Sequence, residues 1–152
     1  MPAIRMELPL APLTGAIQEG FYDTVHELGC GFGEAVCQKA LAIVLRDKGL
    51  LVEANYPLPV IFRGQNIGTF QPDLIIERLV IVEVKATNHL EDWAKPQLLN
   101  YLKCAGGGVG MLVNFGRRPE CKRLIMGDPT NSLPGLSKSI VKNIERWTGK
   151  PA

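Results

Sequence analysis

The stretch PDLIIERLVIVEVKA, residues 72–86, contains two short apolar runs on either side of a polar segment centred on Arg78. Runs rich in Ile, Leu and Val that flank a short polar segment predict a β-hairpin. A turn centred on Arg78 places Asp73 directly opposite Glu83 on the neighbouring strand. Because side chains alternate along a strand, Glu83 and Lys85 share one face and the valines beside them take the other. The hairpin therefore collects two carboxylates and one amine on a single face.

The facing carboxylates of Asp73 and Glu83 repel each other unless a cation lies between them. Facing side chains on paired strands have Cβ atoms roughly 4.5–5.5 Å apart. At about 5 Å and an effective dielectric constant near 20, the repulsion costs on the order of 3 kcal/mol. Such a pair within a run of Ile, Leu and Val predicts a bound metal ion. The alternative is a salt-bridged pair at an exposed sheet edge, which the apolar residues on both sides disfavour.

The rest of the sequence predicts helices and strands in an order typical of an α/β protein. Apolar residues at helical spacing predict helices at about 15–28, 32–48, 91–104 and 136–147. Strands are predicted at 51–56, 60–62, 67–70, 109–115 and 121–126. The helix at 91–104 joins the charged hairpin to the strand at 109–115 as a crossover connection. We therefore expect a mixed central β-sheet flanked by helices.

A chain of 152 residues fits one domain with a sizeable core. Residues 1–13 contain three prolines and are predicted to be an irregular N-terminal arm. Thr14 is then expected to cap the first helix. Residues 14–127 are predicted to form the domain, on which residues 128–152 pack as a loop and a C-terminal helix. That last helix is also a candidate contact surface for a homodimer.

Composition excludes few partners. A net charge of +2 is too small to indicate a nucleic-acid binder, and it does not exclude one. No apolar run approaches the roughly 20 residues that span a bilayer, and the N-terminus lacks the apolar core of a signal peptide. We therefore expect a cytoplasmic protein without a membrane segment. The four cysteines show no C-x-x-C pairing and are expected to be small buried hydrophobic residues.

Two carboxylates and a lysine on one face suit the metal-dependent hydrolysis of phosphodiester bonds. Mg²⁺ prefers oxygen ligands and usually takes one or two carboxylates from the protein. Asp73, Glu83 and the backbone carbonyl of Val84 are the predicted ligands, and Mn²⁺ is the expected substitute. Lys85 is expected to orient or deprotonate the attacking water and to balance charge on the phosphate.

Two predicted helices carry further polar residues. Gln97 and Tyr101 are four residues apart, so they share a helix face and suit contacts to a phosphate or to a lysine. Pairs at this spacing are also common on solvated helices, and the pair alone is weak evidence. Glu34, in the first turn of the second helix, is in line with Cys37 and Leu41 and is expected to point inward. Taken alone, Glu34 is better explained as an acid that stabilises a helix N-terminus.

Taken together, four segments resemble the motifs of the PD-(D/E)XK nuclease superfamily, in its RecB-like branch. They are Gly31-Phe32-Gly33-Glu34, Pro72-Asp73, Glu83-Val84-Lys85 and Gln97-x-x-x-Tyr101. More narrowly, the chain is similar to the bacterial family named for its GxxExxY motif, from about Ile17 through Met126. It departs from that motif at one position, where Cys37 replaces the tyrosine.

The resemblance implies a restriction-endonuclease-like fold with a magnesium site at Asp73 and Glu83 and a catalytic Lys85. It also implies that Glu34 is a carboxylate that completes the metal site. Gln97 and Tyr101 would position DNA or the catalytic lysine.

These observations favour a Mg²⁺-dependent nuclease that hydrolyses DNA in repair, defence or DNA-end processing. The alternative is a catalytically silent nuclease-fold domain that acts as a nucleic-acid-binding or protein-interaction module. The low net charge and small size favour this alternative somewhat. In the first case the partner is nucleic acid, with DNA the first candidate, and a homodimer or a partner protein would enlarge the binding surface. His89 follows Lys85 and could contact substrate, although a surface histidine is the simpler explanation.

Overall fold

The structure is a computed structural model that describes residues 10–88, 94–128 and 133. Its helices are α1 (Ala11–Leu28), α2 (Glu34–Asp47) and α3 (Ala94–Cys104). Its strands are β1 (Val52–Ala54), β2 (Leu58–Phe62), β3 (Gln65–Phe70), β4 (Leu74–Ile76), β5 (Val80–Lys85), β6 (Gly107–Asn114) and β7 (Glu120–Gly127). The element order agrees with the sequence prediction. The helix predicted at 136–147 lies outside the described residues.

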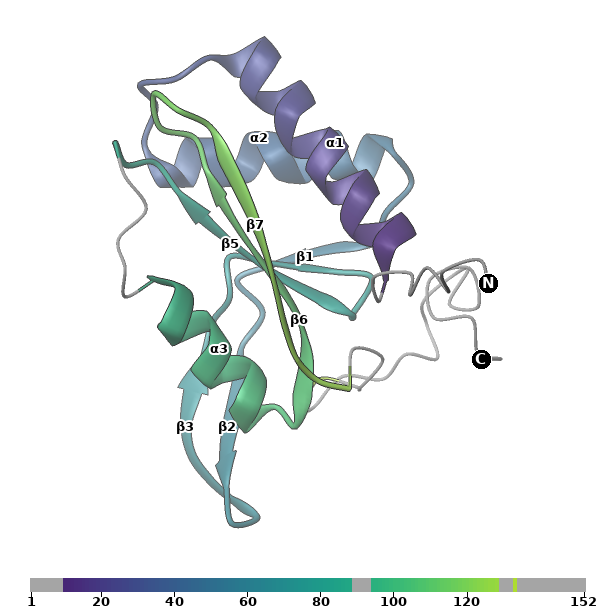
Figure 1. The fold of residues 1–152 in the computed structure, drawn as a ribbon, viewed down its shortest axis with the longest axis vertical. Helices are drawn as coiled ribbons and strands as arrows, with labels where there is room; N and C mark the ends of the chain where they lie inside the picture. Colours follow the sequence, from purple (N-terminus) through teal and green to yellow (C-terminus); the bar gives the residue numbers. More distant parts are fainter. Residues whose placement is uncertain (1–9, 89–93, 129–132, 134–152) are drawn as a thin grey trace, which may run out of the picture.

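Five strands form one mixed sheet in the order β1-β4-β5-β6-β7. Strands β5 and β6 are parallel and are joined through α3, whereas the other neighbours are antiparallel. Strands β2 and β3 form a separate two-stranded sheet that projects away from α1 and α2 (Figure 1). The predicted fold class, an α/β protein with a mixed central sheet flanked by helices, is therefore confirmed.

The register of the β4–β5 hairpin is the one predicted from the sequence. Leu74 pairs with Val82, and Ile76 pairs with Val80. The turn closes with a hydrogen bond from the Leu79 backbone N–H to the Ile76 carbonyl oxygen, 3.0 Å away. Continuing this register by one position brings Asp73 opposite Glu83.

The turn adopts a conformation that is unusual for its residues. Glu77 and Arg78 have φ values of 53° and 54°, in the left-handed region that non-glycine residues rarely adopt. An ion pair with an Arg78 Nε to Glu53 Oε1 distance of 3.0 Å ties this turn to β1. Tertiary contacts therefore hold a backbone conformation that its own residues disfavour.

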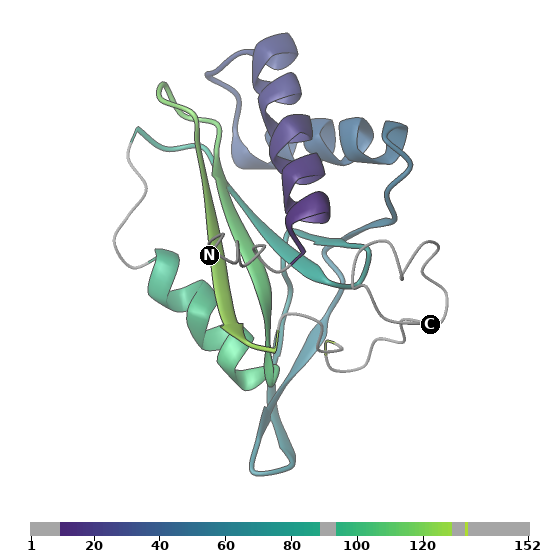
Figure 2. The ribbon, with the colours of Figure 1, turned by 45° about the vertical axis from the view of Figure 1, so that its right-hand side comes forward.

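The sheet separates two hydrophobic cores. Val80, Val82 and Val84 pack with α1 and α2 on one face. Ile81 packs with Leu98 of α3 on the other face. Helix α3 lies on the opposite side of the sheet from α1 and α2 (Figure 2). Because Glu83 and Lys85 have the same parity as Ile81, they emerge on the α3 face, as the alternation predicted.

The first helix begins earlier than predicted. It starts at Ala11 rather than near Gly15, so part of the predicted irregular arm is helical. Pro12 lies in the first turn, where the missing N–H costs nothing and the fixed φ favours a helix. Thr14 is not the cap, because its hydroxyl donates a hydrogen bond to the Leu10 carbonyl oxygen, 3.2 Å away. This corrects both the helix start and the role of Thr14.

The strand after α3 begins earlier than predicted. It starts at Gly107 rather than near Val109, so Gly107 and Gly108 belong to β6. Both have positive φ values, which glycine adopts without steric cost. A Cβ on Gly107 would lie 2.8 Å from the Asp128 backbone nitrogen, so the strand needs glycine there.

None of the helices in the part of the chain that the structure describes is long and apolar enough to cross a membrane.

Candidate active site

Asp73 and Glu83 exchange hydrogen bonds with each other's strand. The Asp73 backbone N–H donates to Glu83 Oε1 over 3.2 Å. The Val84 backbone N–H donates to Asp73 Oδ2 over 2.7 Å. Each carboxylate is therefore aimed by a backbone donor of the opposite strand, and these donors offset part of the repulsion between the two acids.

Burial makes the charged forms of both acids unfavourable. Burial and, to a smaller extent, the neighbouring Asp73 charge raise the pKa of Glu83 to about 7, against the opposing effects of the Asp73 N–H and Lys85. Burial also raises the pKa of Asp73, while the hydrogen bond from Val84 and the charge of Lys85 oppose that rise. A cation bound between these two half-buried acids would stabilise their charged forms.

Four of the predicted site residues line one cavity. Glu83, Lys85, Gln97 and Tyr101 surround a space of about 270 Å³. The remaining lining residues are Phe70, Ala94, Leu98 and Leu112. The spacing on α3 therefore does bring Gln97 and Tyr101 to the face that carries the catalytic candidates.

Tyr101 is held by an aromatic contact that the sequence did not reveal. Its ring stacks on Phe70 with a centroid distance of 3.2 Å and an interplanar angle of 10°. Phe70 ends β3, so this contact connects the β2–β3 hairpin to α3 at the cavity. A stack of this kind fixes the direction of the Tyr101 hydroxyl.

Glu34 is the first residue of α2 and is exposed, not inward-pointing as expected. Its charge nevertheless reaches the site, because it contributes to the raised pKa of both Asp73 and Glu83. Within the described residues, no three His, Cys, Asp or Glu side chains form a group that could hold a metal ion. The role of Glu34 as a ligand therefore stays a prediction.

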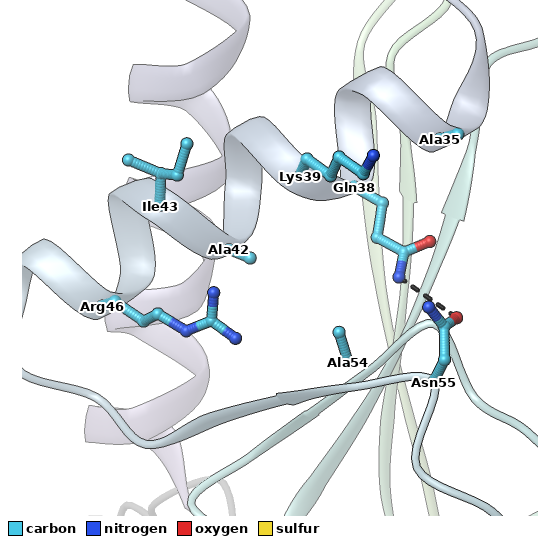
Figure 3. A pocket seen from close by; sticks show the side chains of 8 residues that line it. All are labelled: Ala35, Gln38, Lys39, Ala42, Ile43, Arg46, Ala54 and Asn55. Atoms are coloured by element: carbon cyan, nitrogen blue, oxygen red, sulfur yellow. Dashed lines mark hydrogen bonds between the residues drawn. The ribbon is translucent and has the colours of Figure 1, made fainter.

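Two residues that the sequence did not identify as part of the site bind the backbone of Asp73. The Gln38 amide donates to the Asp73 carbonyl oxygen over 2.9 Å, and the Asn55 backbone N–H donates to the same oxygen over 3.1 Å. Gln38 Nε2 also lies 3.3 Å from Asn55 Oδ1 (Figure 3). Gln38 follows Glu34 by one helical turn, which was the only signal for it.

Asn114 fixes the loop that leaves the site. Its side chain is fully buried at the end of β6. Oδ1 accepts hydrogen bonds from the backbone N–H groups of Thr87 and Gly116, at 3.0 and 3.1 Å, and Nδ2 donates to the Thr87 carbonyl oxygen. A buried amide satisfied in this way holds the segment after Lys85 against β6. His89 lies outside the described residues.

The cysteines only partly follow the prediction. Cys37 is buried, and its thiol donates a weak hydrogen bond to the Phe32 carbonyl oxygen, 3.8 Å away. Burial raises its pKa, which keeps the thiol protonated. Cys30 and Cys104, in contrast, are exposed. Cys37 thus behaves as a small buried hydrophobic residue.

The donor set at Asp73 and Glu83 fits a hard divalent cation. Both acids offer carboxylate oxygens, and β5, which carries Glu83, offers the Val84 backbone carbonyl; these are ligand types that Mg²⁺ takes. Burial raises the pKa of both acids, so a bound cation would stabilise their charged forms.

No curated protein and no solved structure gives a significant match to this chain. The family model of the PD-(D/E)XK nuclease superfamily does match, over residues 11–124. This range covers α1, α2, the acidic hairpin, α3 and most of the sheet. The narrower placement in the RecB-like branch and in the GxxExxY family stays a prediction. Fold and sequence match agree, and the chain belongs to the PD-(D/E)XK nuclease superfamily.

Proposed function

We propose that this protein is a Mg²⁺-dependent nuclease that hydrolyses phosphodiester bonds in DNA. The observation that carries the proposal is the exchange of hydrogen bonds between Asp73 and the strand of Glu83, beside a cavity that Lys85 also lines. Superfamily membership supports a nuclease-type activity. The fold class and the half-buried acids support metal-dependent hydrolysis rather than a purely structural role for Asp73, Glu83 and Lys85.

Each site residue has a distinct role in the proposed reaction. Asp73, Glu83 and the Val84 carbonyl would hold Mg²⁺, or Mn²⁺ in its place, and Glu34 would complete the set. The ion, when bound, polarises the phosphate and lowers the pKa of a bound water. Lys85 orients the attacking water and offsets negative charge on the phosphate. Gln97 and Tyr101 reach the same cavity and position either the DNA or Lys85.

The proposal predicts that Asp73→Asn abolishes cleavage. Asparagine keeps an oxygen that can accept the Val84 N–H, so the strand contact remains while the charge is lost. We expect at least a roughly hundred-fold loss of rate, as is typical when a group that stabilises transition-state charge is removed. The measurement is cleavage of labelled single-stranded, duplex and branched DNA in Mg²⁺ and in Mn²⁺.

Asp23→Asn is the matched control, because Asp23 lies on α1 and pairs with Lys48 away from the site. It should cleave at the wild-type rate. Equal cleavage by wild type and Asp73→Asn would place the active site elsewhere. An inactive wild type that still binds DNA would favour the silent binding module instead.

A further inference from the structure

A second cavity lies between α2 and β1, and we refer to it as the α2–β1 cavity (Figure 3). Its volume is about 370 Å³, larger than the cavity that Glu83 and Lys85 line. It is lined by Ala35, Gln38, Lys39, Ala42, Ile43, Arg46, Ala54 and Asn55. None of these residues has a role in the proposed hydrolysis.

The α2–β1 cavity is directly connected to the catalytic strand. Gln38 and Asn55, which form one end of its lining, both bind the Asp73 carbonyl oxygen. One end of the cavity therefore contacts the backbone of a proposed metal ligand. The cavity lies on the α1–α2 face of the sheet and Glu83 emerges on the α3 face, so a substrate strand that leaves Asp73 reaches the cavity around the edge strand β1.

The charged residues of the α2–β1 cavity are both cationic. Lys39 and Arg46 contribute positive charge, and the lining contains no aspartate or glutamate. Arg46 Nη2 donates to the Val52 carbonyl oxygen over 3.0 Å, which holds the guanidinium across the space between α2 and β1 (Figure 3). A guanidinium and an ammonium at the rim of a cavity are suited to a phosphate group.

The interior of the cavity suits the apolar and polar parts of a nucleotide. Ala42 on α2 and Ala54 on β1 line it with methyl groups from opposite sides, so that a base can pack between them (Figure 3). Within the described residues, Asn55 Nδ2 makes no hydrogen bond to protein, and it lies on the side of the amide toward Ala54, so one donor faces the cavity end (Figure 3). Base edges are recognised by such amide groups.

We propose that the α2–β1 cavity binds one unpaired nucleotide of the strand that leaves the cleavage site. Its phosphate lies against Lys39 and Arg46, and its base lies between Ala42 and Ala54. This inference rests on the proposed nuclease function and makes single-stranded or frayed DNA the substrate. A closed duplex keeps its bases stacked inside and cannot place one in a concave site without the cost of unpairing it.

The test measures DNA binding separately from cleavage. Fluorescence anisotropy of a short labelled oligothymidylate is recorded in EDTA against salt concentration, for wild type, Lys39→Met and Lys103→Met. Lys103 is an exposed lysine on α3, so its substitution makes the same change in net charge outside the cavity. Lys39→Met should weaken binding about three- to ten-fold at low salt, whereas Lys103→Met should not. The slope of log K against log salt should fall by about 0.7 for one lost phosphate contact.

A second variant tests the cavity without changing charge. Ala54→Phe fills it from β1, where an aromatic residue is compatible with a strand. It should weaken binding of the oligothymidylate by a factor similar to that of Lys39→Met, while circular dichroism confirms the fold. A blunt duplex should compete more weakly than the single strand for wild type.

The outcomes separate this inference from the proposed nuclease. Equal affinities for wild type, Lys39→Met and Ala54→Phe would overturn the cavity assignment, and so would a duplex that binds as tightly as the single strand. If wild type cleaves DNA in that case, the nuclease proposal survives alone. If wild type never cleaves but loses binding through both variants, the cavity stands and the nuclease proposal fails.

Discussion

Glu83 shows what burial does to a single carboxyl group. In the folded protein burial raises the pKa of Glu83 from 4.5 to about 7. Between these values the folded state binds more protons than the unfolded chain, so this group's contribution to stability is full below about pH 4.5 and is lost as the pH rises through about 7. The lost stability amounts to about 3 kcal/mol, because one pKa unit corresponds to about 1.4 kcal/mol.

Glu83→Gln should remove this pH dependence. Relative to wild type in EDTA, the variant should gain up to about 3 kcal/mol of unfolding free energy between about pH 5 and pH 8. Glutamine keeps a carbonyl oxygen for the Asp73 N–H, so packing changes little. The measurement is urea unfolding at several pH values.

Glu120→Gln, at the start of β7, is the control and should follow the wild-type pH profile. Parallel profiles for wild type and Glu83→Gln would show that Glu83 is as well solvated in the folded protein as in the unfolded chain.

Local sequence was sufficient to predict the acidic pair and Lys85. Their relation depends on a hairpin whose residues are close in sequence, and alternation alone fixes the face. Gln38 could not be predicted in this way, because its contact with Asp73 spans 35 residues and depends on how α2 packs on the sheet. For the same reason the exposed position of Glu34 could not be foreseen from its spacing to Cys37.

At the scale of elements, the loop after β6 is packed against the loop after β5. A Cβ on Gly116 would overlap the Thr87 carbonyl oxygen and lie 2.8 Å from the Thr87 carbonyl carbon. The neighbour is backbone and cannot move aside as a side chain can. Any larger residue at this position therefore has to separate the two strand ends.

Gly116→Ala should lower the unfolding free energy by roughly 2–3 kcal/mol, the upper part of the range for overpacking. It should also slow cleavage, because Lys85 ends the strand that is displaced. Gly68→Ala is the matched control: this β3 glycine has no atom within 4 Å of an added Cβ. The control should change stability by less than about 1 kcal/mol. The measurement is thermal unfolding of both variants. Equal stabilities would mean that the loop after β5 moves away from the added methyl group without loss of unfolding free energy.

Elements were predicted better than their ends. Periodicity located α2, α3 and β5 within a few residues, but it placed the start of α1 too late, because Pro12 was interpreted as part of an arm. A proline in the first turn is compatible with a helix as well as with an irregular arm. The packing of Leu13 in the core favours the helix, and that packing could not be seen in the sequence.

At the scale of the whole molecule, the proposed metal ligands come from the sheet and from α2. The pairing of β1 with β4 and the separation of β2–β3 from the sheet arise from contacts between distant segments, which the sequence pattern does not encode. A cation bound at Asp73 and Glu83, with Glu34 as an additional ligand, would cross-link these parts of the folded protein. The unfolded chain has no such site.

Mg²⁺ should therefore stabilise the native protein. At a concentration one hundred times its dissociation constant, the expected gain in unfolding free energy is about 2.7 kcal/mol. The gain should vanish in Asp73→Asn and shrink in Glu34→Gln, measured by thermal unfolding across a Mg²⁺ titration. Full stabilisation of Glu34→Gln would return Glu34 to the simpler role of an acid at a helix N-terminus. Equal stabilisation of Asp73→Asn would place the ion elsewhere.

The turn between β4 and β5 also limits how this gene can change. Glu83 follows Asp73 by ten positions, and the turn with the left-handed pair Glu77-Arg78 sets that interval. Inserting or deleting one codon there would shift the strand register by one residue. One of the two carboxylates would then lie on the opposite face of the sheet, against the valine core. Substitutions in the turn preserve the interval, whereas a frame-preserving insertion or deletion does not. Among descendants of this gene, the turn should vary in composition and stay constant in length.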